Sequence, residues 1–371
     1  MTSETSEEMT MTSESSEEKI PALKEILKRA TEEKVSDIFL VSGRPVSFRK
    51  NGQVKDINSK RLMHADTERL IREIYDMDDS TIDKLLKTGD DDFSFALPGV
   101  ARFRVSAFRQ RGSLSAVIRT ISFKLPDYRD LGIPDQVIEF SREKKGMVLV
   151  TGPAGTGKST TLACIIDQIN KSEEKHIITL EDPIEFLHRH DKSIVSQREI
   201  SVDTQDYVTA LRAALRQSPD VILLGEMRDY ETINVAMTAA ETGHLLFSTL
   251  HTLGAANTIE RIIDVFPANQ QPQIIMQLSI VLQAVVSQQL VPAKDGGVMP
   301  AFEIMTVTPA IRNMIRENKV HQIEGLLYSS AKPDMISMDQ SLLALFKAGR
   351  ITRETALTYA TNPEMLGKKL V

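Results

Sequence analysis

The sequence of 371 residues contains a single cysteine, no tryptophan and only 5% aromatic residues. One thiol, that of Cys164, excludes an internal disulfide and any metal site built from several cysteines. No apolar run approaches the roughly 18 to 20 residues that span a membrane, and the N-terminus lacks the basic and then apolar pattern of a secretory signal. These absences predict a cytoplasmic protein, and the length suits two or three domains.

The formal net charge of −6 comes entirely from the first 18 residues, which contain six glutamates and no other charged side chain. They also contain two near-copies of one octapeptide, MTSETSEE and MTSESSEE. A segment of Ser, Thr and Glu cannot bury an apolar core, so residues 1–18 are predicted to form a disordered acidic tail. The rest of the chain has equal numbers of basic and acidic side chains and few aromatics, which disfavours nucleic acid as a partner.

Residues 152–159 read GPAGTGKS and match G-x-x-x-x-G-K-[ST], the pattern of phosphate-binding loops. The apolar run MVLVT at 147–151 predicts a buried parallel strand before the loop, and the apolar spacing of TTLACIIDQI predicts a helix after it. This arrangement places backbone N–H groups and the positive end of a helix around a phosphate. The sequence therefore predicts binding of ATP with Mg²⁺. The expected ligands are Gly152, Gly155, Thr156, Gly157, Lys158, Ser159 and Thr160, with Lys158 on the β- and γ-phosphates and Ser159 on Mg²⁺.

The N-terminal part of the chain, residues 19–122, is predicted to be an α+β domain. Asn51-Gly52 is a strong signal for a hairpin turn between two strands. Two prolines and a glycine in FKLPDYRDLGIP predict a linker at 123–134. The predicted helices lie at 20–34, 66–76 and 80–87, and predicted strands at 92–97, 101–109 and 114–121.

From residue 135 to residue 371, short apolar strands alternate with helical stretches, which predicts a doubly wound parallel sheet. Helical spacing dominates after about residue 269. The predicted strands lie at 147–151, 176–180, 221–224 and 245–248, and the later helices at 272–289, 309–318 and 338–348.

Two of these strands end in acidic side chains. HIITL runs into Glu181 and Asp182, and VILLG runs into Glu226. The carboxyl ends of parallel strands share the edge at which the phosphate loop lies. We therefore expect Glu226 to hold Mg²⁺ and Glu181 to orient or activate the attacking water, with Asp182 as the alternative for that role. Asp220 precedes its strand and would lie roughly 20 Å from Glu226 in an extended chain, so it is not expected at the site.

Two histidines flank the apolar run LLFSTL. His251 follows the run and is expected on the nucleotide side, where it could contact the γ-phosphate or the hydrolytic water. His244 precedes the run and is a second candidate contact of the nucleotide. Neither has a Cys or His partner at the spacing of a zinc site.

In this order, the segments TGPAGTGKSTT, TLEDPIEF, ILLGEMRD and AAETGHLLFSTLHT resemble the Walker A, Asp, Walker B and His boxes of the secretion ATPases. These bacterial ring motors drive type IV pili and type II secretion. The resemblance implies an α/β protein with a PAS-like α+β N-terminal domain, then a RecA-like P-loop ATPase domain with a helical C-terminal region. It implies that Glu181 is the catalytic acid and Glu226 the Walker B acid.

Within that family, PAIRNMIRENKV at 309–320 resembles the C-terminal AIRNLIRE signature of the PilT-type retraction ATPases. Extension and type II secretion members usually have a four-cysteine metal motif, which this chain cannot form. The resemblance thus favours a motor for pilus retraction and twitching motility. In the segment 309–320, Ile311, Met314 and Ile315 have helical spacing, while Arg312, Arg316 and Lys319 lie on other faces. The segment is therefore either an amphipathic helix needed for packing or a relay of ring motion to the pilus machinery.

The resemblance also implies a homohexamer in the cytoplasm, attached to the cytoplasmic membrane through an inner-membrane platform protein of the pilus machine. Another pilus ATPase is a further partner that it suggests. Family members use arginines of a neighbouring N-terminal domain as contacts to the phosphates. The matching residues here are Arg102, Arg104 and Arg119, with Arg261 at a family position near the nucleotide.

Three other functions stay open from the sequence. One is an extension or secretion ATPase, which the missing cysteines and the segment 309–320 argue against. Another is an accessory ring subunit that binds nucleotide but acts mainly as a partner of another motor. The presence of Lys158, Glu181 and Glu226 argues against it, since such a subunit need not keep all three. A nucleic-acid translocase is disfavoured by the balanced charge.

Overall fold

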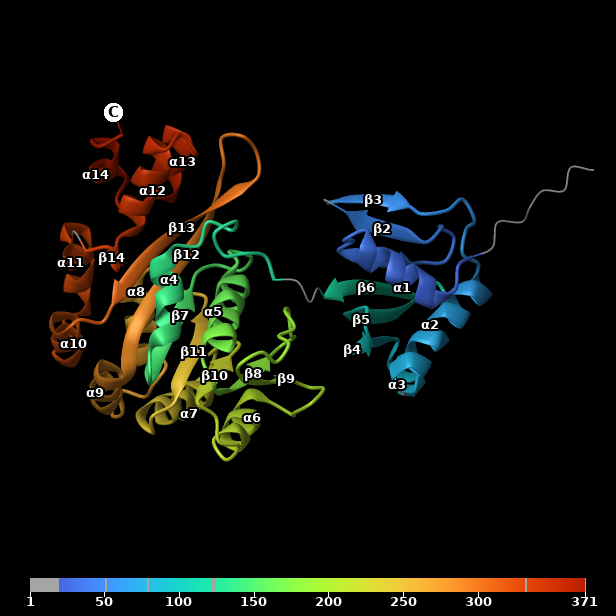
Figure 1. Ribbon diagram of the computed structural model, residues 1–371, viewed down its shortest axis with the longest axis horizontal. Helices are drawn as coiled ribbons and strands as arrows, with labels where there is room; N and C mark the ends of the chain where they lie inside the picture. The colour runs from blue at the N-terminus through green and yellow to red at the C-terminus, as the bar shows by residue number, and fades with distance from the viewer. Residues whose placement is uncertain (1–19, 51, 79, 122–124, 331, 371) are drawn as a thin grey trace, which may run out of the picture. The chain divides into compact units, whose positions relative to one another are not determined.

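The computed structural model describes residues 20–50, 52–78, 80–121, 125–330 and 332–370, and the tail predicted at 1–18 lies outside them. The chain divides into two compact units, Met1–Ser122 and Phe123–Val371 (Figure 1). Each unit has its own sheet and its own buried core.

The first unit is a six-stranded antiparallel sheet covered by helices. The strand order is β3-β2-β1-β6-β5-β4. Along β5, buried residues alternate with less buried ones, so one face packs on the helices while the other carries polar side chains. The strands are β1 (Asp37–Leu40), β2 (Ser47–Lys50), β3 (Gln53–Asp56), β4 (Asp90–Leu97), β5 (Ala101–Gln110) and β6 (Ser113–Ile121), and the helices α1 (Leu23–Glu32), α2 (His64–Asp78) and α3 (Asp83–Thr88).

The second unit contains an eight-stranded sheet of order β14-β13-β12-β7-β11-β10-β8-β9. The six strands from β12 to β9 are parallel, while β13 and β14 run antiparallel to their neighbours. The parallel strands are β7 (Gly146–Thr151), β8 (His176–Glu181), β9 (Ile194–Glu199), β10 (Val221–Leu224), β11 (Leu245–Leu250) and β12 (Leu282–Pro292), followed by β13 (Val298–Thr306) and β14 (Met335–Ile336).

Helices cover both faces of this sheet (Figure 1). Separate apolar clusters lie on the two faces, one beneath α4, η1 and α5 and the other beneath α6 to α11. This is the doubly wound architecture that the alternating pattern predicts. The helices are α4 (Asp135–Ile138), η1 (Glu139–Arg142), α5 (Lys158–Ser172), α6 (Tyr207–Ala214), α7 (Tyr230–Glu241), α8 (Ala255–Asp264), α9 (Gln271–Val281), α10 (Pro309–Arg316), η2 (Val320–Gln322), α11 (Ile323–Ser329), α12 (Met338–Lys347), α13 (Arg353–Tyr359) and α14 (Pro363–Gly367).

The helix predicted at 272–289 is wrong over its second half. Helix α9 ends at Val281, and the chain continues directly as strand β12. Eight of the eleven residues of β12 are buried, because the strand pairs with β7 on one side and β13 on the other while helices cover its faces. A strand buried on both faces shows no alternation, so its apolar run cannot be distinguished from a buried helix by periodicity alone.

No helix within the described ranges of the chain is both long enough and apolar enough to cross a membrane.

Candidate nucleotide site

The candidate site lies at the carboxyl edge of the parallel sheet in the second unit. In the strand register, Leu250 of β11 pairs with Thr151 of β7, while Leu224 of β10 pairs with Leu180 of β8. The residues that directly follow these pairs therefore leave the sheet at one edge. The phosphate loop therefore lies beside Glu181, Glu226 and His251, although these segments are up to a hundred residues apart in the sequence.

These side chains surround a cavity of about 260 Å³. The cavity also reaches Phe186 and Tyr207, which follow β8 and begin α6. Most of the polar side chains that line this cavity were predicted from the sequence to contact the nucleotide, and the structure brings them together. The side chains that bear on the chemistry are Lys158, Ser159, Glu181, Glu226, Arg228 and His251.

Lys158 is the first residue of α5 and is only 8% exposed. Its Nζ donates hydrogen bonds to the carbonyl oxygens of Gly152 at 2.8 Å and Pro153 at 2.9 Å. Burial lowers the pKa of Lys158, and the nearby carboxylates of Glu226 and Glu185 oppose that shift. The ammonium group thus lies inside the loop, where an anion would neutralise a partly desolvated charge.

Two glycines of the loop are required by its close approach to strand β12. A Cβ atom on Gly152 would lie 2.2 Å from the backbone oxygen of Gln288, and one on Gly157 would lie 3.1 Å from Nε2 of Gln288. Both glycines have positive φ angles, of 139° and 87°. Only glycine combines that backbone with so little space, so the loop fits the compact phosphate cradle that the motif predicts.

Glu181 ends β8 and faces the cavity. Burial raises its pKa to about 7, although hydrogen bonds from Oγ1 of Thr179 at 2.6 Å and Nε2 of Gln197 at 3.2 Å favour the carboxylate. A carboxylate with a pKa near 7 can accept a proton at physiological pH and release it again. Asp182, the alternative for this role, is exposed and joined to Pro183 by a cis peptide bond.

Glu226 follows β10, and its side chain is 12% exposed. One carboxylate oxygen pairs with Nη2 of Arg228 at 2.5 Å, and the other lies 3.2 Å from Nε2 of His251. Asp220 lies at the amino end of the same strand, where its side chain accepts a hydrogen bond from the backbone N–H of His176 at 2.8 Å. Asp220 and Glu226 therefore lie at opposite ends of β10, as the sequence predicts.

His244 and Arg261, which were also predicted at the site, do not line this cavity. His244 precedes β11, so the length of that strand separates it from the loop, and its Nδ1 lies 3.0 Å from the carbonyl oxygen of Ala239. The same nitrogen lies 3.1 Å from the hydroxyl of Thr242. His244 therefore contacts the end of α7 in this structure and not the edge of the sheet at which the phosphate loop lies. Arg261 is exposed on α8 and does not line the cavity.

A second cavity of about 580 Å³ adjoins the other side of the phosphate loop. Thr156, Gly157 and Thr160, expected at the nucleotide, line this cavity and not the first one. Its other walls include Leu131, Pro300 and Arg350. The loop thus separates a polar cavity from a more apolar one.

The three arginines predicted to act in a neighbouring subunit lie in the first unit, on one face of its sheet. Arg104 and Arg119 are directly paired across β5 and β6, and Arg102 lies two residues from Arg104 on the same face. Nε of Arg119 also pairs with the buried carboxylate of Asp37 at 3.0 Å. Nη1 of Arg49 pairs with the same carboxylate at 3.4 Å, so this face is rich in guanidinium groups.

Several residues near the site were not predicted from the sequence. Thr179, Gln197 and Arg228 contact the predicted acids, and Gln288 contacts the phosphate loop. Arg228 stands two residues after Glu226 and could have been noticed from that spacing. Gln288 gives no such signal, because it lies 127 residues from Thr161, the helix residue that it contacts.

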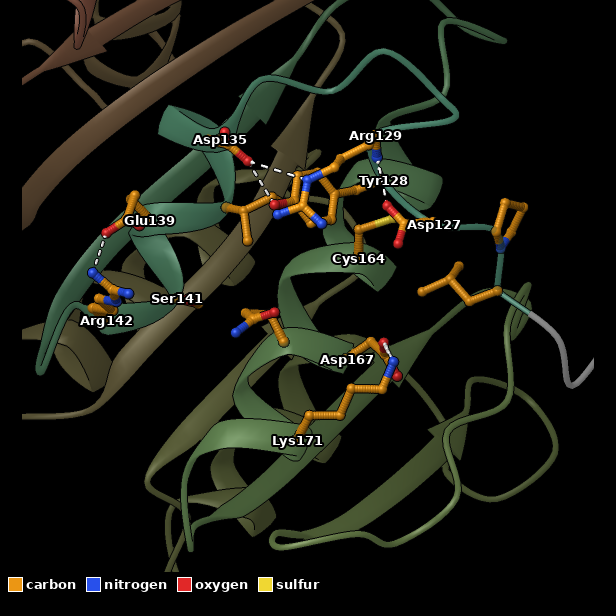
Figure 2. A pocket seen from close by; sticks show the side chains of 14 residues that line it. Asp127, Tyr128, Arg129, Asp135, Glu139, Ser141, Arg142, Cys164, Asp167 and Lys171 are labelled. Carbon is orange, nitrogen blue, oxygen red and sulfur yellow. Dashed lines mark hydrogen bonds and ion pairs between the residues drawn. The ribbon is translucent and has the colours of Figure 1, made fainter.

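A larger polar cavity, of about 640 Å³, lies between the segment 125–142 and helix α5 (Figure 2). The pKa of Cys164 in its wall is raised to about 12 by burial, so the thiol stays protonated. Each basic side chain that lines this cavity is paired with a carboxylate, which disfavours it as a phosphate site. The pairs are Arg129 with Asp135 at 3.9 Å, Arg142 with Glu139 at 2.7 Å and Lys171 with Asp167 at 2.6 Å.

Comparisons with known proteins agree with this geometry. The family model described as type II/IV secretion system protein matches residues 12–299. The chain belongs to the type II/IV secretion system protein family. It is 46% identical to the type IV pilus retraction ATPase PilT of Pseudomonas aeruginosa over 341 residues, covering 92% of this chain and 98% of that relative. It is 50% identical to a twitching motility protein of Neisseria gonorrhoeae over 276 residues, or 74% of each chain.

A solved relative from the same family has a closely similar fold. The crystal structure of the pilus retraction motor PilT with bound ADP superposes with a TM-score of 0.86 at 47% identity, covering 93% of this chain and 98% of that one. These findings confirm the predicted fold class, an N-terminal α+β unit followed by a RecA-like ATPase unit. They also confirm the predicted similarity to the retraction ATPases.

Proposed function

We propose that this protein is a hexameric motor that hydrolyses ATP to power retraction of type IV pili. The observation that carries the proposal is the convergence of Lys158, Ser159, Glu181 and Glu226 on one cavity beside a phosphate loop. The similarity to PilT over nearly the full length of both chains supports the retraction function.

In this proposal the triphosphate lies in the loop, where Lys158 and the backbone N–H groups bind its charged oxygens. Ser159 and Glu226 would hold Mg²⁺, which neutralises charge on the phosphates when it is bound. Arg228 and His251 already pair with the two oxygens of Glu226, and they would orient this carboxylate. The base and ribose would extend past Thr160 into the second cavity.

Glu181 would accept the proton of the attacking water. Its pKa near 7 suits this step, because the carboxylate is a substantial fraction of the population at neutral pH and still has affinity for a proton. Thr179 and Gln197 both donate to the same carboxylate oxygen, Oε1, and so fix the orientation of the Glu181 side chain. His251, which lines the same cavity, would contact the γ-phosphate or that water.

Arginines from a neighbouring subunit would complete the site. Arg102, Arg104 and Arg119 share one sheet face of the first unit, and a guanidinium pairs well with phosphate because it is planar and permanently charged. A site completed by a neighbour requires a ring of subunits, and a closed ring follows from repeated head-to-tail contacts. Arg261 and His244 would contribute only if such a neighbour approaches them.

We place the motor in the cytoplasm, at the inner face of the cytoplasmic membrane, bound to the platform protein of the pilus machine and working there alone or with another pilus ATPase. The helix α10 contains most of the segment that resembles the retraction signature, and lies beyond all nucleotide motifs, so it is our candidate for contact with that machinery.

Deletion of the gene in its host tests the proposal against the alternative of an extension or secretion ATPase. A retraction motor is expected to leave excess surface pili and no twitching, because pili still extend but no longer disassemble. Loss of surface pili would contradict the proposal and favour extension. A chromosomal Lys158→Ala allele should reproduce the deletion phenotype; if it behaves as wild type, nucleotide hydrolysis is not the basis of the function.

A further inference from the structure

Strand β12 brings Gln288 against the phosphate loop. The strand is parallel to β7, and Ser287 pairs with Thr151, the last residue of β7. Gln288 therefore stands level with the start of the loop. Its side chain is 3% exposed and points into the space between the loop and helix α5.

Both ends of the Gln288 carboxamide are used. Nε2 donates to the carbonyl oxygen of Thr156 at 2.6 Å, and Oε1 accepts from the hydroxyl of Thr161 at 2.8 Å. The reversed amide orientation would set two carbonyl oxygens against each other at Thr156, so the hydrogen-bond partners fix the assignment. Thr156 belongs to the loop and Thr161 to the first turn of α5, so one buried side chain joins the two parts of the cradle.

The backbone of β12 also leaves no space for a side chain at the start of the phosphate loop. The carbonyl oxygen of Gln288 approaches Gly152 so closely that a Cβ atom there would lie at 2.2 Å. On the other side of the loop, Nε2 of Gln288 would lie 3.1 Å from a Cβ atom on Gly157. Gln288 thus contacts the beginning and the end of the phosphate loop.

We infer that Gln288 is a positioning residue that holds the phosphate loop and the first turn of α5 in the orientation that binds phosphate. This inference rests on the proposed function and adds to it a residue outside the four sequence motifs. The physical reason is satisfaction of buried polar groups: without the amide, the carbonyl of Thr156 and the hydroxyl of Thr161 lose their partner. The loop would then be free to turn that peptide away, and its N–H groups would no longer converge.

The test compares Gln288→Met with Gln289→Met in the full-length chain. Methionine has a similar length and removes only the amide. Gln289 is the matched control, since it is 8% exposed on the same strand but faces the other way, with Nε2 3.3 Å from the carbonyl oxygen of Tyr359. The measurements are the Kd for ADP by titration calorimetry and the KM and kcat for ATP.

We expect Gln288→Met to raise the Kd for ADP and the KM for ATP by about tenfold, which is the effect of roughly one buried hydrogen bond. The change in kcat should be smaller, about threefold or less, because the loop holds the phosphates in the ground state and in the transition state alike. Gln289→Met should keep both constants within about twofold of wild type.

A second variant keeps the inference testable if Gln288→Met does not fold. Thr161→Val keeps the shape of a fully buried side chain and removes only the hydroxyl that donates to Gln288. It should also raise the Kd for ADP, and the double variant should bind no more weakly than Gln288→Met alone, since both act through one interaction.

The outcomes separate the inference from the proposed function. Wild-type affinity in folded Gln288→Met, an equal loss in Gln289→Met, or unchanged affinity in Thr161→Val when Gln288→Met is unfolded would each overturn the role of Gln288. If the wild-type chain itself neither binds ADP nor hydrolyses ATP, the proposed function fails instead.

Discussion

The guanidinium of Arg312 donates a hydrogen bond to the carbonyl oxygen of Ile280 at 2.6 Å. The same nitrogen donates to the carbonyl oxygen of Ser279 at 2.5 Å. Both carbonyls belong to the last turn of α9, where backbone oxygens have no partner within the helix. Arg312 therefore caps α9 from helix α10, and α9 leads directly into β12, the strand that carries Gln288.

This contact changes how the predicted relay segment should be tested. We expect Arg312→Ala to lower the free energy of unfolding by about 1–2 kcal/mol, because two carbonyl oxygens at the end of α9 lose a charged donor. Arg316→Ala should be neutral within about 0.5 kcal/mol, since Arg316 is exposed. Chemical denaturation of both variants measures the difference. Equal stabilities would contradict the capping role of Arg312.

Arg316→Ala is then the clean test of coupling to the pilus machinery. We expect a folded protein with near-normal ATPase activity that fails to restore twitching in a deletion strain. Lys294→Ala is a control that removes a cation outside α10. Normal twitching with the Arg316 variant would show that this side chain does not transmit force.

Glu181→Gln should separate nucleotide binding from hydrolysis. The change keeps the size of the side chain but removes the proton acceptor, so kcat should fall by about 100-fold or more while the Kd for ADP stays within about threefold. Lys158→Ala should instead weaken nucleotide binding, because the loop loses its buried ammonium. Steady-state kinetics and calorimetry distinguish the two. Near-normal turnover by Glu181→Gln would remove Glu181 from the mechanism.

The pH dependence follows from the surroundings of Glu181. Its pKa is raised to about 7 by burial, and the active form is the carboxylate, so kcat/KM should rise with pH and level off above about 7. The Thr179 hydroxyl stabilises that carboxylate, so Thr179→Val should raise the pKa further and move the acidic limb upward by about one pH unit.

The pH–rate profiles of wild type and Thr179→Val provide the measurement. At high pH the two should converge, because Glu181 is ionised in both. A downward shift of the limb, or none in a folded variant, would contradict the assignment of this limb to Glu181.

If these arginines act on the site of a neighbouring subunit, two inactive variants should complement each other in mixed rings. A double variant, Arg102→Ala with Arg104→Ala, should be nearly inactive, and so should Lys158→Ala. In mixed rings some sites combine an intact loop with a neighbour's intact arginines, so mixing the two inactive proteins should restore part of the activity.

A concentration series of the wild-type protein is the control for complementation. Its specific activity should rise with protein concentration as rings form, and light scattering measures the ring formation. Mixed rings that form without regaining activity would place the arginines within their own subunit or outside catalysis.

Much of the site could be predicted because its signals are local. The loop sequence 152–159 specifies a backbone shape, and Glu181 and Glu226 each follow a short apolar strand. Strands that are connected by helices pair in parallel, so their carboxyl ends meet at one edge of the sheet, independent of the length of the loops. That rule placed both acids beside Lys158 and placed Asp220 at the other edge, where the structure has it.

Tertiary structure alone decided the features that depend on pairing between distant segments. The chain changes from helix α9 to strand β12 within one apolar run because the backbone of β12 forms hydrogen bonds with the edge of β7. The periodicity of the sequence does not show this pairing. The capping of α9 by Arg312 and the contacts of Gln288 with the loop follow from that switch. The sequence by itself determined which residues could bind phosphate and activate water, because local patterns encode backbone shape and chemical type. Only the packed sheet decided that Gln288 holds the phosphate loop, because its contacts join residues more than a hundred positions apart.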